Sequence, residues 1–163
     1  ADADGGYRVQ VHETTTLAWG RPHLSFDEVT IDVDAAKVAG PDDNLFGVMC
    51  RFRDPGSFTF FVISSDGFAG AGRYQDGERT VFNGAAMLPS AAVLSGEATN
   101  HLQVSCLRST VRMVVNGQIV GEASVPDSPP GDIGLLAGTY TDGGVEIRFD
   151  QIVVRQSNPT AGP

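Results

Sequence analysis

Apolar and polar residues alternate along most of the chain, which is the pattern of half-buried β-strands. Tyr7, Val9 and Val11 alternate with polar residues, and the same period recurs at 29–34 and 145–150. The one stretch with helical spacing is a short piece near Ala85–Leu94. The pattern therefore predicts about twelve strands and very little helix.

One predicted strand differs from the others because it is apolar on both faces. It runs from Phe58 to Ile63 with the sequence FTFFVI. Strands of this kind lie in the interior of a sheet and are covered on both sides. We expect the protein core to cover one face, and a loop or a ligand to cover the other.

Turn residues separate these strands. Asp76-Gly77 and Asn116-Gly117 each stand between two strand-like runs, as in two-residue hairpins whose turn needs positive φ. Proline-containing segments at 40–44 and 125–131 indicate loops. About twelve strands overfill one open sheet, so the predicted fold class is all-β, with two antiparallel sheets packed as a sandwich.

The length and charge limit what the chain can be. It has 163 residues, which suits one domain, and a formal net charge of −9 with Lys37 as its single lysine. Nucleic acid is therefore an unexpected partner, because its binding depends on clustered basic residues. No apolar run approaches the ~20 residues of a membrane helix, so membrane insertion is not expected either. We place a trimmed leader at 1–6, the sandwich domain at 7–155 and a tail or linker at 156–163.

Both cysteines fall on apolar strand faces. Cys50 shares a predicted face with Phe46, Val48 and Phe52, and Cys106 follows a similar alternating run. Both thiols should therefore point into the core. Two buried free thiols and a disulfide are both compatible with this placement.

A series of motifs in order resembles a known family. They are Asn44–Asp54, Phe60–Gly67, Asn100–Leu102, Val115–Gly117 and Gly131–Gly138. The series is similar to bacterial concanavalin A-like, laminin-G-like jelly rolls related to the 3-keto-disaccharide hydrolase domain. The resemblance implies a jelly-roll sandwich, a secreted or cell-surface location, and a disulfide between Cys50 and Cys106.

The beginning of the chain departs from this family. Relatives usually have one more strand before the segment that matches Tyr7–His12. We therefore expect the sheet edge beside Tyr7–His12 to be covered by upstream residues, or by a strand or tail of a neighbouring molecule. Such strand addition would produce a homo-oligomer or filament.

Candidate catalytic and metal sites are weak. Glucanases of this fold carry three closely spaced carboxylates on one strand, which act as nucleophile, helper and acid. The nearest candidate is the face of Glu28, Thr30, Asp32 and Asp34, where a Thr occupies the helper position and no second Glu follows at the position of the acid. An enzyme is therefore not the favoured interpretation. His12, His23 and His101 lie on separate predicted elements without zinc-ligand spacing. The resemblance implies a structural Ca²⁺ at Asp150, although one carboxylate cannot hold the ion alone.

Sugar binding needs aromatic faces beside planar hydrogen-bonding groups. The candidate ligand-binding residues are Trp19, Arg51, Arg53, Phe61, Arg73 and Tyr74. Trp19 is equally compatible with the core, and the commonest role of Arg51 and Arg53 on an outer face is a surface salt bridge.

The leading hypothesis is a non-catalytic, extracytoplasmic, lectin-like module that binds a glycan or a surface. The first alternative is a structural subunit of a filament or surface layer, in which a neighbour completes the sheet. The second is a 3-keto-glycoside hydrolase, which is implied by the resemblance alone.

Overall fold

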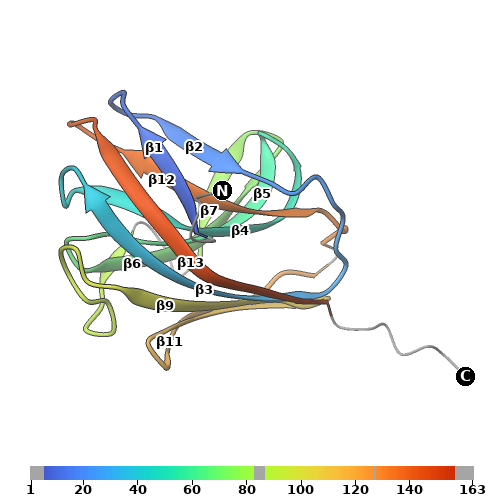
Figure 1. Ribbon diagram of the computed structural model, residues 1–163. Coiled ribbons are helices and arrows are strands. Elements are labelled where there is room, and N and C mark those ends of the chain that lie inside the picture. The colour runs from blue at the N-terminus through green and yellow to red at the C-terminus, as the bar shows by residue number, and fades with distance from the viewer. Residues whose placement is uncertain (1–5, 83–86, 127, 157–163) are drawn as a thin grey trace, which may run out of the picture.

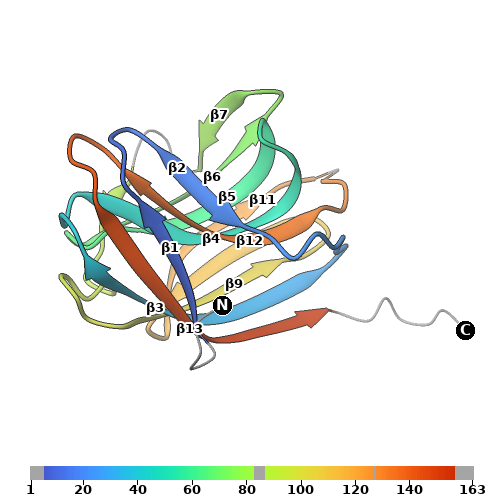
Figure 2. The same ribbon diagram turned by 45° about the horizontal axis from the view of Figure 1, so that its top comes forward.

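Two antiparallel β-sheets packed face to face form the protein (Figures 1 and 2). The computed structural model describes residues 6–82, 87–126 and 128–156, and this part of the chain contains thirteen strands and no helix. The predicted all-β sandwich is confirmed. No described segment is a helix long and apolar enough to cross a membrane.

The first sheet has six strands, whose order brings both ends of the domain together. In spatial order they are β1 (Tyr7–Val11), β13 (Val145–Gln156), β3 (Val29–Ala39), β9 (Asn100–Cys106), β10 (Thr110–Val115) and β11 (Gln118–Ser124). The outer face of this sheet is polar, because the buried residues of β3 alternate with partly exposed ones.

The second sheet has seven strands. Its main path is β2 (Leu17–Gly20), β12 (Asp132–Thr139), β4 (Asn44–Asp54), β5 (Ser57–Ile63), β6 (Phe68–Gln75) and β7 (Glu78–Val81), and the short β8 (Leu88–Pro89) pairs with β6. The apolar run 58–63 forms β5, an interior strand as predicted. Ala85 and Ala86 lie outside the described residues, and from Met87 to Leu94 the chain forms β8 and a turn rather than a helix.

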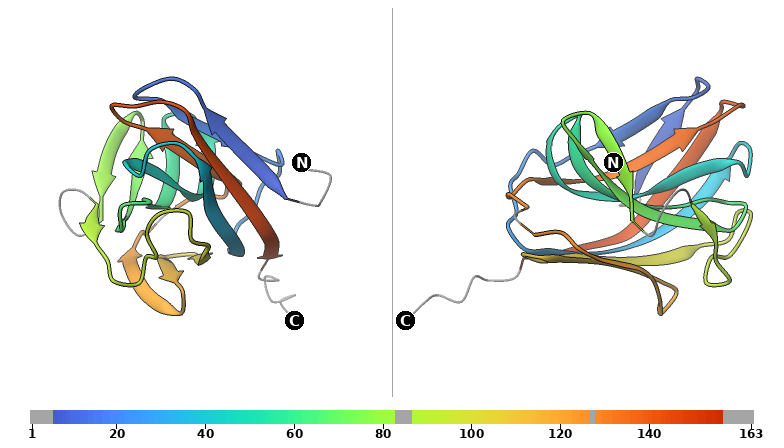
Figure 3. Two further views of the ribbon diagram at one scale, coloured as in Figure 1. Left: turned by 60° about the vertical axis from the view of Figure 1, so that its left-hand side comes forward. Right: turned by 180° about the vertical axis from the view of Figure 1, so that it is seen from behind.

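The core lies between the sheets, whose two layers are visible from the side in Figure 3. Val33 and Ile147 from the first sheet and Val48 and Phe61 from the second are fully buried there. A disulfide between Cys50 of β4 and Cys106 of β9 crosses this core and joins the two sheets covalently. The disulfide that the resemblance implies is thus confirmed.

Both predicted hairpin turns are confirmed. Asp76 and Gly77 have φ values of 51° and 83°, and Asn116 and Gly117 have φ values of 50° and 85°. Positive φ at both central residues matches the right-handed twist of the strands that such a turn joins.

A bulge in β4 reverses which face of the sheet its side chains occupy. Arg51 has a φ of 57°, and the pairing of β4 with β5 shifts between Cys50 and Asp54. Phe46, Val48 and Cys50 point into the core, whereas Phe52 lies on the opposite face beside Met49. The prediction that Phe52 shares the face of Cys50 was therefore wrong, because an extra residue interrupts the alternation.

The strand β1 lies at the border of the first sheet and pairs there with β13, from Val145 to Phe149. Beyond a second irregularity at Gln151, β13 continues beside β3 with Ile152 and Val153 about 40% exposed (41% and 42%). No described strand pairs with the edge of this half of β13 that faces away from β3, or with the free edge of β1. The expectation that a further segment covers the edge stays a prediction.

Candidate functional site

Five aromatic side chains form a continuous cluster on the outer face of the seven-stranded sheet. They are Trp19 of β2, Phe52 of β4, Phe58 and Phe60 of β5, and Tyr74 of β6. The Trp19 ring centroid lies 5.6 Å from that of Phe52, and the Phe58 centroid lies 5.0 Å from that of Tyr74. No described element forms a third layer over this face, so the cluster borders solvent.

The local sequence places these rings. Phe58 and Phe60 alternate with inward residues of β5, so they share the outer face, and Phe52 reaches it because of the bulge at Arg51. Gly72 leaves space beneath Phe60, since a Cβ at position 72 would lie 2.6 Å from Cζ of the Phe60 ring. The rings rest on a closely packed apolar layer that includes Met49, Val62 and Leu136.

A shallow groove runs over part of the cluster. It has a volume of about 60 Å³ and is lined by Leu17, Leu45, Phe58, Phe60, Val62, Tyr74, Arg79 and Leu136. Phe60 and Tyr74 are half-buried, so part of each ring remains accessible from the groove. Rigid, partly exposed rings with one charged neighbour are the usual components of a sugar-binding surface.

A larger, polar cavity adjoins the groove. Its volume is about 270 Å³, and it is lined by Arg51, Arg53, Phe58, Thr59, Arg73, Tyr74, Gln75, Pro126, Ser128 and Pro129. Phe58 and Tyr74 line both hollows. The two hollows nevertheless lie on opposite faces of the sheet, because Arg73 pairs with Thr59 on the face of the core, whereas Tyr74 pairs with Phe58 on the outer face.

Arg51 forms the wall of this cavity. Its guanidinium is buried and donates hydrogen bonds to the carbonyl oxygens of Ser128 (3.2 Å) and Leu107 (2.6 Å). Burial lowers the pKa of Arg51 from its usual value, and the negative charge of Asp27, 3.8 Å away, opposes this shift. Arg51 thus holds the loop around Ser128 against β4 in addition to its ion pair with Asp27.

Three arginines at the site differ from the rest of the chain. Among the described residues, Arg53, Arg73 and Arg79 have no carboxylate within 4 Å. Every other arginine forms an ion pair: Arg8, Arg21, Arg51, Arg108, Arg112, Arg148 and Arg155. Among the described residues, no Asp or Glu lines the groove or the cavity.

Arg21 closes the other end of the aromatic cluster. Its guanidinium carbon lies 4.1 Å from the centroid of the Phe52 ring, and its Nη1 donates to Asp132 at 2.9 Å. The ion pair positions the cation over the ring, where the quadrupole of the aromatic face attracts it. This arrangement leaves Arg21 less available to a ligand than the unpaired arginines.

The structure divides the residues predicted for the site between the two faces of the seven-stranded sheet. Arg51, Arg53 and Arg73 line the cavity that Tyr74 borders, whereas the rings of Trp19 and Tyr74 belong to the cluster on the outer face. Phe61 does not take part, because it points between the sheets and has 0% exposure.

Sequence reasoning missed four residues of the site: Phe52, Phe58, Phe60 and Arg79. The double-sided apolar pattern of 58–63 already indicated Phe58 and Phe60, whereas nothing in the alternation marks the bulge that turns Phe52 outward.

Asp150, the candidate calcium ligand, accepts hydrogen bonds from Arg148 at 2.6 and 3.3 Å. Within the described ranges, no three acidic, histidine or cysteine side chains gather in a group able to hold a metal. The calcium site stays a prediction.

The acidic stripe of β3 lies on the outer face of the other sheet, and His101 of β9 joins it. The ring nitrogens of His101 lie 2.7 Å from Asp34 Oδ1 and 3.1 Å from Asp32 Oδ1. The hydrogen bond to Asp34, followed by that to Asp32, raises the pKa of His101 above its usual value near 6.5, and partial desolvation opposes the shift. Arg155 also pairs with Asp32, so the stripe is internally neutralised.

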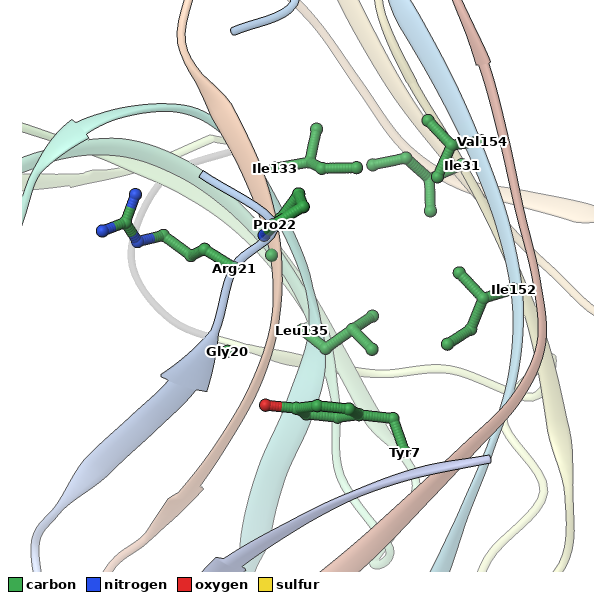
Figure 4. A pocket seen from close by; sticks show the side chains of 10 residues that line it. Tyr7, Gly20, Arg21, Pro22, Ile31, Ile133, Leu135, Ile152 and Val154 are labelled. Carbon is green, nitrogen blue, oxygen red and sulfur yellow. The ribbon is translucent and has the colours of Figure 1, made fainter. Parts of the chain in front are cut away.

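A separate apolar cavity of about 300 Å³ opens on the flank between the two sheets (Figure 4). Tyr7 of β1 and Ile152 and Val154 of β13 point into it from the first sheet, opposite Leu135 of β12. Gly20 lets the Tyr7 ring enter, because a Cβ there would lie 2.0 Å from the Tyr7 hydroxyl oxygen. The cavity lies beside the open half of β13.

No protein-family profile and no curated protein matches the sequence. Solved structures match the fold. The carbohydrate-binding module CBM66 from Bacillus subtilis has a TM-score of 0.69 at 12% identity, with 93% of this chain and 96% of that chain covered. Bacillus licheniformis β-glucanase has a TM-score of 0.66 at 12% identity (96% and 81% covered), and sheep galectin-11 has 0.55 at 13% (93% and 98% covered).

These identities are too low to carry over a ligand or a reaction. They show that the chain has the jelly-roll sandwich fold of the concanavalin A-like class, which confirms the fold that the resemblance implies.

Proposed function

We propose that the protein is a non-catalytic, carbohydrate-binding module of an exported protein, and that it binds its glycan on the outer face of the seven-stranded sheet. The observation that carries this proposal is the aromatic cluster around Phe58, Phe60 and Tyr74. It borders solvent, although its strands β5 and β6 lie in the interior of the sheet. Folding alone gives no reason to gather large rings on a face that no other layer covers.

The geometry favours a saccharide over a purely apolar ligand. A pyranose ring has an apolar face that packs on aromatic rings and hydroxyl groups at its rim that need hydrogen-bond partners. Tyr74 and Arg79 line the groove and offer those partners next to the rings. The fold of a carbohydrate-binding module and of two galectins among the similar structures agrees with this proposal.

The disulfide supports an exported protein. Cys50 and Cys106 are bonded, and bonds of this kind form and persist in oxidising compartments such as the periplasm or the cell exterior.

A glycan array followed by titration calorimetry tests the proposal. Phe60→Leu and Tyr74→Leu keep an apolar side chain but remove a flat ring, so each should weaken binding about three- to tenfold. Tyr7→Leu is the matched control, because Tyr7 is a half-buried aromatic residue on the opposite flank. Equal affinity of all three variants and the parent protein, or no glycan bound by the parent, would overturn the proposal.

The structural-subunit alternative has its own observation in its favour. In the described part of the fold, the outer half of β13 pairs only with β3 and its other edge has no partner strand, and Ile152 and Val153 are exposed there beside the apolar cavity. A neighbour that adds a strand would bury them. Light scattering after size exclusion at micromolar concentration tests this alternative, and a monomer contradicts it.

A further inference from the structure

We propose that the flank between the two sheets binds an extended peptide of another protein, which adds a strand to β13 and inserts apolar side chains into the cavity shown in Figure 4. This site is separate from the proposed glycan surface, because it opens between the sheets and not on the outer face of the seven-stranded sheet. The protein would then bind a glycan and a second protein at different places.

The first argument is the free backbone edge of β13. The strand β1 accompanies β13 only from Val145 to Phe149, whereas β3 pairs with it as far as Gln156. Within the described ranges, no strand lies on the β1 side of residues 152–156. The N–H and C=O groups of a strand point alternately to its two sides, so some groups of 152–156 have no described ladder partner there. An extended peptide provides such partners.

The second argument is the cavity directly beside this edge. Ile152 and Val154 point into it, and Leu135 of the other sheet lies opposite. Both Ile152 and Val154 are exposed, although they face an apolar hollow. A strand added beside β13 would direct every second side chain into the same hollow, because opposite residues of neighbouring strands share a face. The volume of about 300 Å³ suits large apolar side chains.

The third argument is that the chain has no remaining side chain able to fill this cavity. The residues outside the described ranges are 1–5, 83–86, 127 and 157–163. In sequence they are Ala, Gly, Pro, Ser, Thr, Asn and Asp, so none of them is a large aliphatic or aromatic residue. The side chains that fill the cavity therefore come from another molecule.

The net charge indicates which molecule this is. Each copy of the chain has a formal net charge of −9, so two copies repel one another, whereas a positively charged partner is attracted. The favoured ligand is therefore an extended peptide of a different protein. It carries large apolar residues at alternate positions and lysine or arginine among the others.

Peptide display followed by fluorescence anisotropy tests this inference. The parent protein selects from a phage-displayed library of random peptides of about eight residues, which is within the usual length of a strand. We expect the enriched sequences to carry large apolar residues at alternate positions. The most enriched peptide is then synthesised with N-methyl groups on alternate residues, in both phases. One phase should weaken binding about tenfold, because it removes the donors that face β13.

A pair of variants locates the site. Ile152→Lys places a charge at the mouth of the cavity and should weaken peptide binding about tenfold or more, since an apolar contact is lost. Ile119→Lys is the matched control, because Ile119 is an exposed isoleucine on β11, at the opposite edge of the same sheet. This control should leave peptide binding unchanged. Neither variant should alter glycan binding, so this inference and the proposed function fail independently.

Several results would overturn the inference. A library without enriched apolar alternation, or equal binding by the parent protein and Ile152→Lys, excludes the edge of β13 as a peptide site. Unchanged affinity of both N-methylated peptides excludes an added strand. A parent dimer that Ile152→Lys converts to a monomer in light scattering assigns the flank to a second copy. Much tighter peptide binding after removal of residues 1–5 assigns the edge to the beginning of the chain itself.

Discussion

The disulfide should contribute much of the stability of this fold. Cys50 and Cys106 are separated by 56 residues in sequence, and both are fully buried between the sheets. Closing a loop of that length restricts the unfolded chain by an entropy that corresponds to about 4 kcal/mol at 25 °C. Replacing both residues, as Cys50→Ala/Cys106→Ala, should lower the free energy of unfolding by about that amount.

Urea denaturation provides the measurement. Trp19 is the single tryptophan and is half-buried in the aromatic cluster, so its fluorescence reports on the seven-stranded sheet. The loss of about 4 kcal/mol should lower the melting temperature by about 8–16 °C for a chain of this size. The m-value should rise as well, because an unfolded chain without the cross-link exposes more surface.

The parent protein reduced under denaturing conditions and refolded with its thiols free is the control, and it should unfold close to the double variant. A difference in unfolding free energy below about 1 kcal/mol between the oxidised parent and the variant would refute the loop-entropy reasoning. The stability of the fold would then come from packing between the sheets that the alanine variant retains.

Two further outcomes are expected. His101 is half exposed between Asp34 and Asp32, and its raised pKa means that its contribution to stability is fully present below pH 6.5 and is lost as the pH rises through the folded-state pKa. An NMR titration of the ring should give a pKa above 6.5, and His101→Gln should remove this pH dependence; a ring that titrates at or below 6.5 contradicts the geometry. The amides of Arg8–His12 should exchange slowly at high protein concentration and faster on dilution if a neighbouring molecule covers the edge of β1. Rapid exchange at every concentration would leave that edge uncovered.

The fold was accessible from the sequence because its determinants are local. Alternation with a period of two marks each strand face, and the dipeptides Asp76-Gly77 and Asn116-Gly117 mark turns that need positive φ. The number of strands then requires two sheets. Which strands are neighbours, such as β1 beside β13, depends on contacts distant in sequence and came from the structure.

The site was only partly accessible for a related reason. Arg53, Arg73 and Tyr74 were identified by residue type, and the structure brings them to one cavity. Phe61 was wrongly included because β5 is apolar on both faces, and the pattern alone does not say which face is the core. Phe52 was assigned to the core because an irregular residue in a strand has no signature in the alternation.

The bulge at Arg51 has a consequence for how β4 tolerates substitution. The residues at even positions before Arg51 belong to the core, namely Phe46, Val48 and Cys50. Polar substitutions at these positions should be depleted in a mutational scan for folded protein. After Arg51 the phase reverses, and Phe52, again at an even position, belongs to the aromatic cluster on the outer face. One strand therefore contributes to the core in its first half and to the outer aromatic cluster in its second. The deletion of Arg51 would remove the irregularity and leave Phe52 on the outer face, because Phe52 would then directly follow the core-facing Cys50.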